Sequence, residues 1–154
     1  MTIVNAVPED FGELVSIYER EGLVDEVSLV GKDARKEFAE IGTKRIIWLA
    51  KDEGITVGSI QLVLDSEKKD LANGMNRAMI HHLRVSYSHH GKRIGSKLYK
   101  TAEQKAKELG VKTLTLEVEK SNTKAKEIYE HWGFVYVGEG EDPNEVVMEK
   151  RLHI

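Results

Sequence analysis

The amino-acid sequence predicts one α/β domain spanning residues 1–154, built on a mixed sheet with helices on both of its faces. Three observations predict this class. Candidate strands and helices follow one another in the order βααβββαβαββ, which is typical of a layered α/β domain. The 154 residues suffice for one full-sized core, and 40% of them are hydrophobic. No linker, repeat or low-complexity stretch divides the chain.

The N-terminal half supplies three strands and two helices. Pro8 favours a helix start directly after the first strand, because proline is well tolerated in the first helical turn. The apolar residues that follow recur at helical spacing: Phe11, Leu14, Val15 and Tyr18. Asp52-Glu53-Gly54 is typical of a hairpin turn, and the polar residues 66–76 are expected to form a mobile loop. The expected elements are strands over residues 2–7, 46–50 and 56–64, a helix beginning at Pro8, and a helix over residues 32–41.

The C-terminal half repeats the alternation of strand and helix. A strand over residues 79–85 leads through a glycine loop into a helix that ends at Gly110. One face of this helix is apolar: Ile94, Leu98, Ala102, Ala106 and Leu109. A strand over residues 111–118, a short helix over 122–132, and a hairpin of 134–137 with 146–152 complete the chain. The central strand–helix–strand unit is expected to be parallel, with a right-handed crossover.

The glycine loop carries the strongest functional signal. Residues 89–98 read His-His-Gly-Lys-Arg-Ile-Gly-Ser-Lys-Leu, with two glycines four residues apart at the start of a helix. Flexible backbone can turn its N–H groups inward, and a helix N-terminus attracts anions. Residues 89–107 hold six Lys or Arg and a single acid, whereas residues 1–41 hold ten acids and four bases. The loop is therefore predicted to bind a pyrophosphate, although such a basic stretch is also an ordinary solvated helix face.

Two separated motifs resemble the GNAT superfamily of N-acetyltransferases. The family's cofactor motif is Gln/Arg-x-x-Gly-x-Gly/Ala, and this chain places His90, Arg93 and Gly95 at its fixed positions. The later segment Asn122-x-x-Ala125-x-x-x-Tyr129, followed by Gly133-Phe134, matches fully. The resemblance implies a mostly antiparallel central sheet with a parallel strand–helix–strand core, and acetyl-CoA as co-substrate.

The resemblance also assigns roles to individual residues. Tyr129 would act as general acid on the departing thiolate, and the backbone amide of Leu83 would stabilise the oxyanion. The residues implied in binding acetyl-CoA are Leu83, Val85, His90, Gly91, Lys92, Arg93, Gly95, Ser96 and Asn122. Arg93 suits the start of a helix if its φ is negative, and would be strained at positive φ. Without the resemblance, Asn122 is equally a helix cap and Tyr129 a core aromatic.

His81 is the first choice for the general base, since some relatives carry histidine at the matching position. Strand alternation puts Met79, His81 and Leu83 on one face and turns Ile80, His82 and Arg84 to the other. An unperturbed imidazole suits base catalysis at neutral pH. A half-buried structural histidine is an equal interpretation of His81, another residue or ordered water could serve as base, and a register error of one residue would exchange the two histidines.

Several classes of function are disfavoured. The chain has no cysteine, so thiol nucleophiles, zinc–thiolate sites and disulfides are excluded. No metal site is expected, because neighbouring histidines in a strand diverge and no His/Glu pair lies at i, i+4 on a helix. A net charge of −3 argues against nucleic-acid binding, and no apolar run approaches the ~20 residues of a membrane span. The N-terminus shows no signal peptide, so a cytoplasmic location is expected.

The sequence leaves the acceptor open. Carboxylates and tyrosines gather in the regions expected to form the acceptor pocket: Tyr18, Glu19, Glu21, Asp25, Glu26, Tyr136, Glu139, Glu141 and Asp142. This excess of acid favours a small cationic amine attacked directly in a ternary complex. A peptide or protein acceptor, or a non-catalytic acyl-CoA sensor, are the alternatives. The sheet edges also allow a homodimer.

Overall fold

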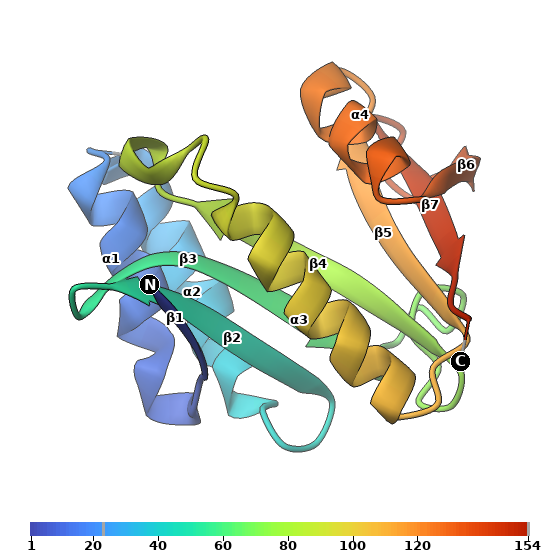
Figure 1. Ribbon diagram of the computed structural model, residues 1–154, viewed down its shortest axis with the longest axis horizontal. Coiled ribbons are helices and arrows are strands. Elements are labelled where there is room, and N and C mark those ends of the chain that lie inside the picture. Colours follow the sequence, from blue (N-terminus) through green and yellow to red (C-terminus); the bar gives the residue numbers. More distant parts are fainter. Residues whose placement is uncertain (23, 154) are drawn as a thin grey trace.

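The central element is a seven-stranded sheet in the order β1-β2-β3-β4-β5-β7-β6 (Figure 1). The computed structural model describes residues 1–22 and 24–153, apart from the side chains of residues 24–30. Neighbouring strands are antiparallel except for the parallel pair β4–β5, so the predicted mixed, mostly antiparallel sheet is confirmed. The strands are β1 (Thr2–Asn5), β2 (Arg45–Asp52), β3 (Ile55–Val63), β4 (Arg77–Val85), β5 (Thr113–Glu119), β6 (Val135–Glu139) and β7 (Glu145–Arg151).

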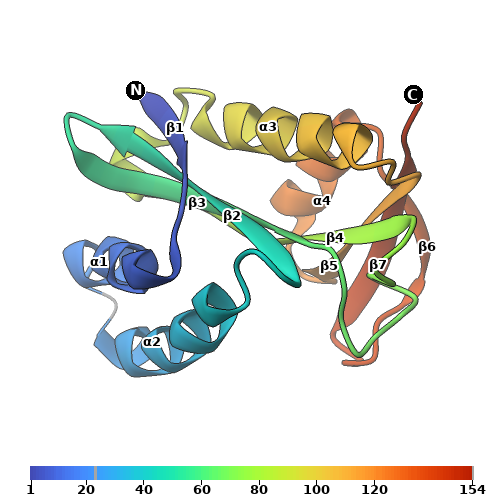
Figure 2. The same cartoon turned by 90° about the horizontal axis from the view of Figure 1, so that it is seen from below.

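Helices cover both faces of the sheet, as predicted. Figure 2 shows α1 and α2 on one face and α3 with α4 on the other. None of the helices in the described residues combines the length and apolarity that a membrane crossing needs. The helices are α1 (Phe11–Arg20), α2 (Val24–Ala39), α3 (Ile94–Glu108) and α4 (Thr123–His131), with short 3₁₀ turns η1 (Pro8–Asp10) and η2 (Tyr87–His89) before α1 and α3.

Two apolar cores sit on the two faces. The larger packs α3 and α4 against the sheet, with Leu98, Ala102 and Ala106 of α3 fully buried. The smaller packs Leu14 and Ile17 of α1 against β2. Leu109, predicted on the buried face of α3, is 46% exposed, because the helix has ended and Gly110 turns the chain at φ +80°.

Two segments differ from the prediction. Helix α2 begins eight residues before the predicted residue 32 and includes Gly31. Helix α2 packs against α1, and this tertiary packing overrides the low helix propensity of glycine. The polar loop over residues 66–76 is anchored by buried Leu71 and Ala72. The side chain of Asn73 further fixes it by accepting three backbone hydrogen bonds, each at 3.0 Å.

Candidate functional site

Strands β4 and β5 diverge along their length. They pair at three positions, from Arg77 opposite Thr113 to Met79 opposite Thr115. Beyond Met79, β4 runs on to Val85 while β5 turns away with β7, and Figure 1 shows the two strands opening toward α4. This divergence leaves one edge of β4 without a β5 partner, so its backbone groups are available to an extended ligand.

A β-bulge interrupts β4 in this open part. The register between β3 and β4 shifts so that Ile60 faces two residues, His82 and Leu83. His82 has φ +46°, in the left-handed region that a residue with a Cβ rarely adopts. The predicted alternation is therefore wrong after His81. His82 turns to the same side as His81, toward α2, whereas Leu83 turns to the α3 side with Val85.

The glycine loop uses two left-handed residues to reach α3. Gly91 has φ +82° and Arg93 has φ +62°. Of the two alternatives for Arg93, the structure has the strained one: an arginine stands where the family motif has glycine, in a conformation that favours glycine. No side chain among the described residues caps the N-terminus of α3 at Arg93, which leaves the first backbone N–H groups of the helix free for a ligand.

Gly58 of β3 allows α3 to approach the sheet. An added Cβ there would lie 3.1 Å from the carbonyl oxygen of Arg84 and 3.1 Å from Cδ1 of Leu98. Both distances are tighter than ordinary van der Waals contact, so the start of α3 depends on the missing side chain. The sequence analysis did not single out Gly58, because the reason for it lies in residues far along the chain.

A pocket of about 510 Å³ lies between the end of β4, the glycine loop and α4. Nine of the residues predicted to form the site line it: Leu83, Val85, His90, Gly91, Arg93, Gly95, Ser96, Asn122 and Tyr129. Lys92 and His81 do not line it. The pocket is also lined by residues that the sequence analysis missed: His89, Ile94, Lys124, Ala125, Ile128 and Trp132. The α4 members of this group recur at helical spacing with Tyr129, which is the signal that could have found them.

Tyr129 is held by aromatic packing at the inner wall of the pocket. Its ring lies 5.8 Å from that of Trp132 and 6.1 Å from that of Phe134. Burial raises the pKa of the Tyr129 hydroxyl. Tyr129 therefore keeps its proton at neutral pH and can donate it to a leaving group.

Asn122 and His90 each make a local hydrogen bond. The Asn122 side chain caps α4, because its Oδ1 accepts from the backbone N–H of Ala125 at 3.2 Å. His90 Nε2 lies 2.9 Å from the carbonyl oxygen of Val85, at the end of β4. The cap interpretation of Asn122 is confirmed, and both residues still border the pocket.

His81 and His82 converge on Glu37 of α2, on the face of β4 away from the pocket. Their Nε2 atoms lie 3.3 Å and 3.1 Å from the same oxygen, Oε2 of Glu37. Burial alone would raise the pKa of Glu37, but hydrogen bonds from the two histidines outweigh burial and hold the pKa of this carboxyl well below its usual range. Burial lowers the pKa of His81, and the bond to Glu37 offsets this only in part. Glu37 was not predicted, since nothing in the sequence links it to a strand 44 residues away.

Three of the acidic residues expected around the acceptor form ion pairs within the chain. Glu21 pairs with Arg84 and accepts the backbone N–H of Tyr87 at 3.0 Å. Glu139 pairs with Lys120, and Glu141 pairs with Lys68 at 3.1 Å. Asp25 and Glu26 lie outside the described side chains. These pairings cancel much of the negative charge from which a cationic acceptor was predicted.

Comparisons with known proteins agree with this geometry. The model of the acetyltransferase (GNAT) family matches residues 12–134. Among solved structures, the PaiA N-acetyltransferase from Thermoplasma acidophilum in complex with coenzyme A has 19% identity and a TM-score of 0.77, over 99% of this chain and 100% of that one. The GNAT domain of S. lividans PAT has 19% identity and a TM-score of 0.80, over 97% of this chain and 89% of that one. An aminoglycoside 6'-N-acetyltransferase complexed with coenzyme A has 18% identity and a TM-score of 0.72, over 100% of this chain and 98% of that one. No curated protein sequence matches significantly.

Proposed function

Because this chain belongs to the acetyltransferase (GNAT) family, we propose that it transfers the acetyl group of acetyl-CoA to a primary amine by direct attack in a ternary complex. The observation that carries the proposal is the pocket itself. It joins the free edge of β4, the glycine loop and Tyr129 in one cavity. A pyrophosphate, an extended pantetheine arm and a thiolate leaving group would each meet a suitable partner there.

The pyrophosphate would lie on the glycine loop. The backbone N–H groups of Gly91, Lys92, Arg93, Gly95 and Ser96 are the donors in this proposal, aided by the positive end of the α3 dipole. The side chain of Arg93 is exposed, so its guanidinium can add a charge-assisted contact to a phosphate oxygen. Lys124 at the start of α4 is the second cation at the pocket wall.

The pantetheine arm would run along β4. Backbone groups of Leu83 and Val85 would pair with its amides as a neighbouring strand does, with Asn122 on the opposite wall. At the end of the arm, the Leu83 N–H would stabilise the tetrahedral oxyanion. Tyr129 would then protonate the departing thiolate.

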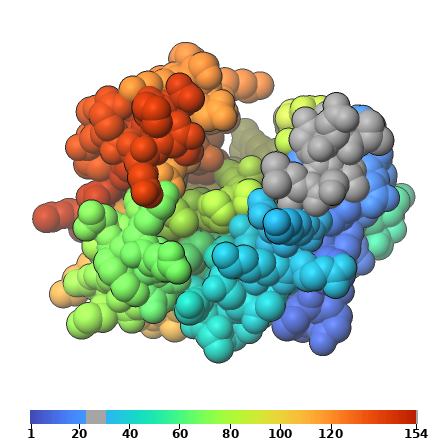
Figure 3. All heavy atoms as spheres, turned by 180° about the vertical axis from the view of Figure 1, so that it is seen from behind, coloured from blue at the N-terminus to red at the C-terminus, as the bar shows by residue number. Residues whose placement is uncertain are grey.

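His81 is the proposed general base, and it approaches from the other side of β4. A space-filling view from behind shows a hollow between α2 and the C-terminal strands, where atoms in the yellow-green of β4 reach the surface (Figure 3). An amine entering there would meet His81 on the α2 side and the thioester on the pocket side. Ordered water is the alternative base, because His81 does not line the pocket.

The acceptor in this proposal is a small cationic amine in the cytoplasm. Support comes from Glu37, a carboxylate with 12% exposure of its side chain on the proposed acceptor side of β4. The structural neighbours also include an aminoglycoside 6'-N-acetyltransferase. Peptide or protein amines remain the alternative acceptor, and an acyl-CoA sensor the alternative function.

Calorimetric titration with acetyl-CoA tests the proposal, with dephospho-CoA and ATP as competitors. Micromolar binding of acetyl-CoA is expected, followed by thiol release when a panel of polyamines, aminoglycosides and peptide N-termini is added. Tyr129→Phe separates enzyme from sensor: an enzyme loses turnover and keeps its affinity for acetyl-CoA. Absence of acetyl-CoA binding would contradict the proposal.

A further inference from the structure

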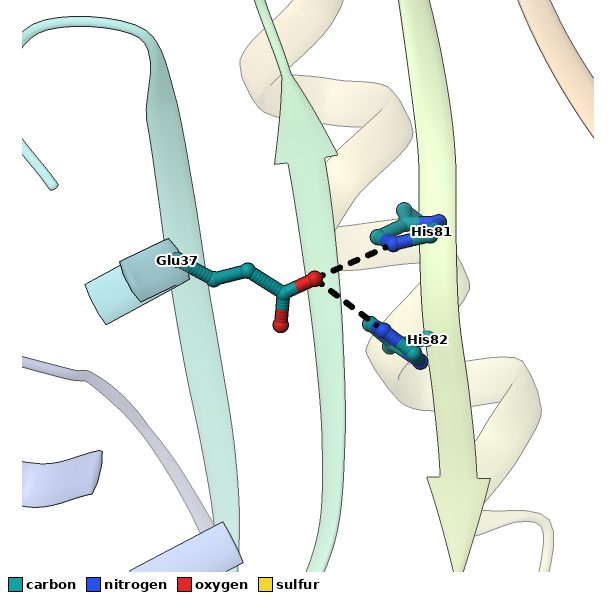
Figure 4. Close-up of side chains that lie close together, drawn as sticks. All are labelled: Glu37, His81 and His82. Carbon is teal, nitrogen blue, oxygen red and sulfur yellow. Dashed lines mark hydrogen bonds and ion pairs between the residues drawn. The ribbon is translucent and has the colours of Figure 1, made fainter. Parts of the chain in front are cut away.

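Three potential metal ligands meet on the α2 side of β4 (Figure 4). Glu37 extends from α2, and His81 and His82 extend from adjacent positions of the strand. One carboxylate oxygen and two imidazole nitrogens all lie within 4.8 Å of one another. We call these residues the Glu37–His81–His82 cluster.

The β-bulge is what brings the second histidine into the cluster. In a regular strand, neighbouring side chains point to opposite faces, and His82 would point away from Glu37. Instead His82 takes φ +46°, a conformation that costs free energy for a residue with a Cβ and that recurs at functional sites. The bulge therefore places a second imidazole beside the Glu37 carboxylate, where one ligand can contact both histidines.

The spacing of the three atoms suits a tetrahedral ion. Zinc binds imidazole nitrogen and carboxylate oxygen at about 2.0–2.2 Å, so two such ligands on a tetrahedron lie about 3.3–3.6 Å apart. The nitrogens of His81 and His82 lie 3.3 Å and 3.1 Å from Oε2 of Glu37. These two distances lie within a few tenths of an ångström of the tetrahedral spacing, and the two histidine nitrogens lie within 4.8 Å of each other.

Glu37 is held in place by outer partners. Its other oxygen, Oε1, accepts from Nε2 of Gln61 at 3.1 Å, and Gln61 accepts from Arg45 at 2.6 Å. Arg45 lies 3.8 Å from Oε2, but its charge is matched by Glu40 at 2.8 Å. Arg45 therefore shares its charge between Glu40 and Glu37, and the Glu37 carboxylate keeps the negative charge that a cation would bind.

The histidines also leave an entrance. The side chains of His81 and His82 are 35% and 40% exposed, so an ion can arrive from solvent and keep a water in its fourth position. We propose that the Glu37–His81–His82 cluster is a three-ligand site for a divalent transition metal of the zinc class. Two imidazoles and one carboxylate favour zinc, cobalt or nickel over magnesium and calcium, which prefer all-oxygen sites.

The test is titration of the full, untagged chain with Zn²⁺ by calorimetry in a non-chelating buffer, repeated with Co²⁺ by visible absorption. One ion per chain is expected, with micromolar or tighter affinity and the absorption bands of four-coordinate Co²⁺. His82→Gly is the sharpest variant, because glycine accepts the left-handed backbone and removes only the ligand. Loss of a residue that only hydrogen-bonds a metal ligand typically weakens metal binding about 10- to 100-fold. We expect His82→Gly, which removes a ligand, to weaken Zn²⁺ binding by more than this.

Two further variants complete the design. Glu37→Gln keeps the shape and removes the anionic ligand, and it should weaken Zn²⁺ binding as His82→Gly does. His89→Ala is the matched control, since His89 pairs with Asp52 at 3.0 Å outside the cluster, and its binding should equal that of the wild type. Unsaturable Zn²⁺ binding in the wild type, or equal affinity in His82→Gly, would overturn the inference. Acetyl-CoA is absent from this assay, so the metal site and the proposed function can fail separately.

Discussion

Arg93 offers a direct test of how the glycine loop is built. Its φ of +62° costs an L-residue roughly 1–2 kcal/mol, and glycine removes that cost. Glycine also loosens the unfolded chain, which costs about 0.4–1 kcal/mol. The net expectation for Arg93→Gly is therefore a stabilisation between about 0 and 1.5 kcal/mol.

The effect of the left-handed backbone can be isolated by comparing the stability of alanine and glycine variants at two adjacent positions, 92 and 93. At Arg93, glycine should be more stable than alanine, because alanine keeps the strain and lacks the guanidinium. At Lys92, whose φ is not positive, glycine should be less stable than alanine by about 0.5–1 kcal/mol. Urea unfolding followed by tryptophan fluorescence measures all four variants against the wild type.

The same pairs separate backbone from charge in ligand binding. Both Arg93 variants lose one charge-assisted phosphate contact, worth about 1.5–3 kcal/mol, so the affinity for acetyl-CoA should fall by at least ~10-fold in each. The loss should shrink at high salt, which screens an exposed charge. If alanine is the more stable residue at both positions, the loop does not require a left-handed residue at 93 and the reasoning fails.

Four further outcomes follow from the structure. Gly58→Ala should destabilise the fold by about 1–3 kcal/mol in urea unfolding, because the new methyl overpacks Leu98 and the Arg84 carbonyl; Gly12→Ala, where the space is open, should not be destabilised. Tyr129→Phe should lower kcat about 10²- to 10⁴-fold while the Kd for acetyl-CoA stays within twofold, and an unchanged kcat would remove Tyr129 as general acid. Burial would raise the pKa of Glu103, but Tyr99, Lys150 and Lys107 outweigh burial and lower that pKa. The stability that the Glu103 carboxylate adds, under about 1 kcal/mol, should therefore be present at pH 7 in the wild type and be lost as the pH falls below about 4.5, and Glu103→Gln should lack this pH dependence in the same unfolding series. If His81 is the base, Zn²⁺ should inhibit turnover in the wild type and spare whatever activity His82→Gly retains, as measured by thiol release.

Much of the fold could be predicted because local patterns and tertiary packing agree. The two-residue turn between β2 and β3 was visible as Glu53-Gly54, and both residues take the positive φ that such a turn needs. The buried face of α3 was visible in the spacing of Leu98, Ala102 and Ala106. The early start of α2 was not visible, because Gly31 is unfavourable in a helix and only contact with α1 reveals why it is tolerated.

The part of the site formed by the glycine loop and α4 could be predicted from the sequence. The prediction was wrong at the bulge of β4, where His82 is one extra residue in the strand. Nine predicted residues line the pocket. They could be predicted because the glycines mark the loop and the spacing of apolar residues marks α4. The bulge at His82 has only a weak sequence signal, since histidine is enriched at positive φ but most histidines take negative φ. The bulge reversed the predicted faces of His82 and Leu83. The sequence-based argument that neighbouring histidines diverge, and so cannot share a metal, therefore does not hold for His81 and His82.

The bulge connects the two sides of β4. One extra residue turns Leu83 toward the pocket, where its backbone is proposed to hold the oxyanion, and turns His82 toward Glu37. A metal that shifts His82 relative to Glu37 would therefore act on the same bulge that positions Leu83. Deleting His82 would remove the extra residue, and in the regular strand that results Leu83 follows His81 and points to the opposite face, still toward α3. That variant should lose one metal ligand and keep Leu83 on the side of the pocket. His82→Gly keeps the bulge and loses the same ligand. If the two variants bind acetyl-CoA equally, the pocket needs only the face of Leu83; weaker binding by the deletion variant would show that the pocket needs the bulge itself.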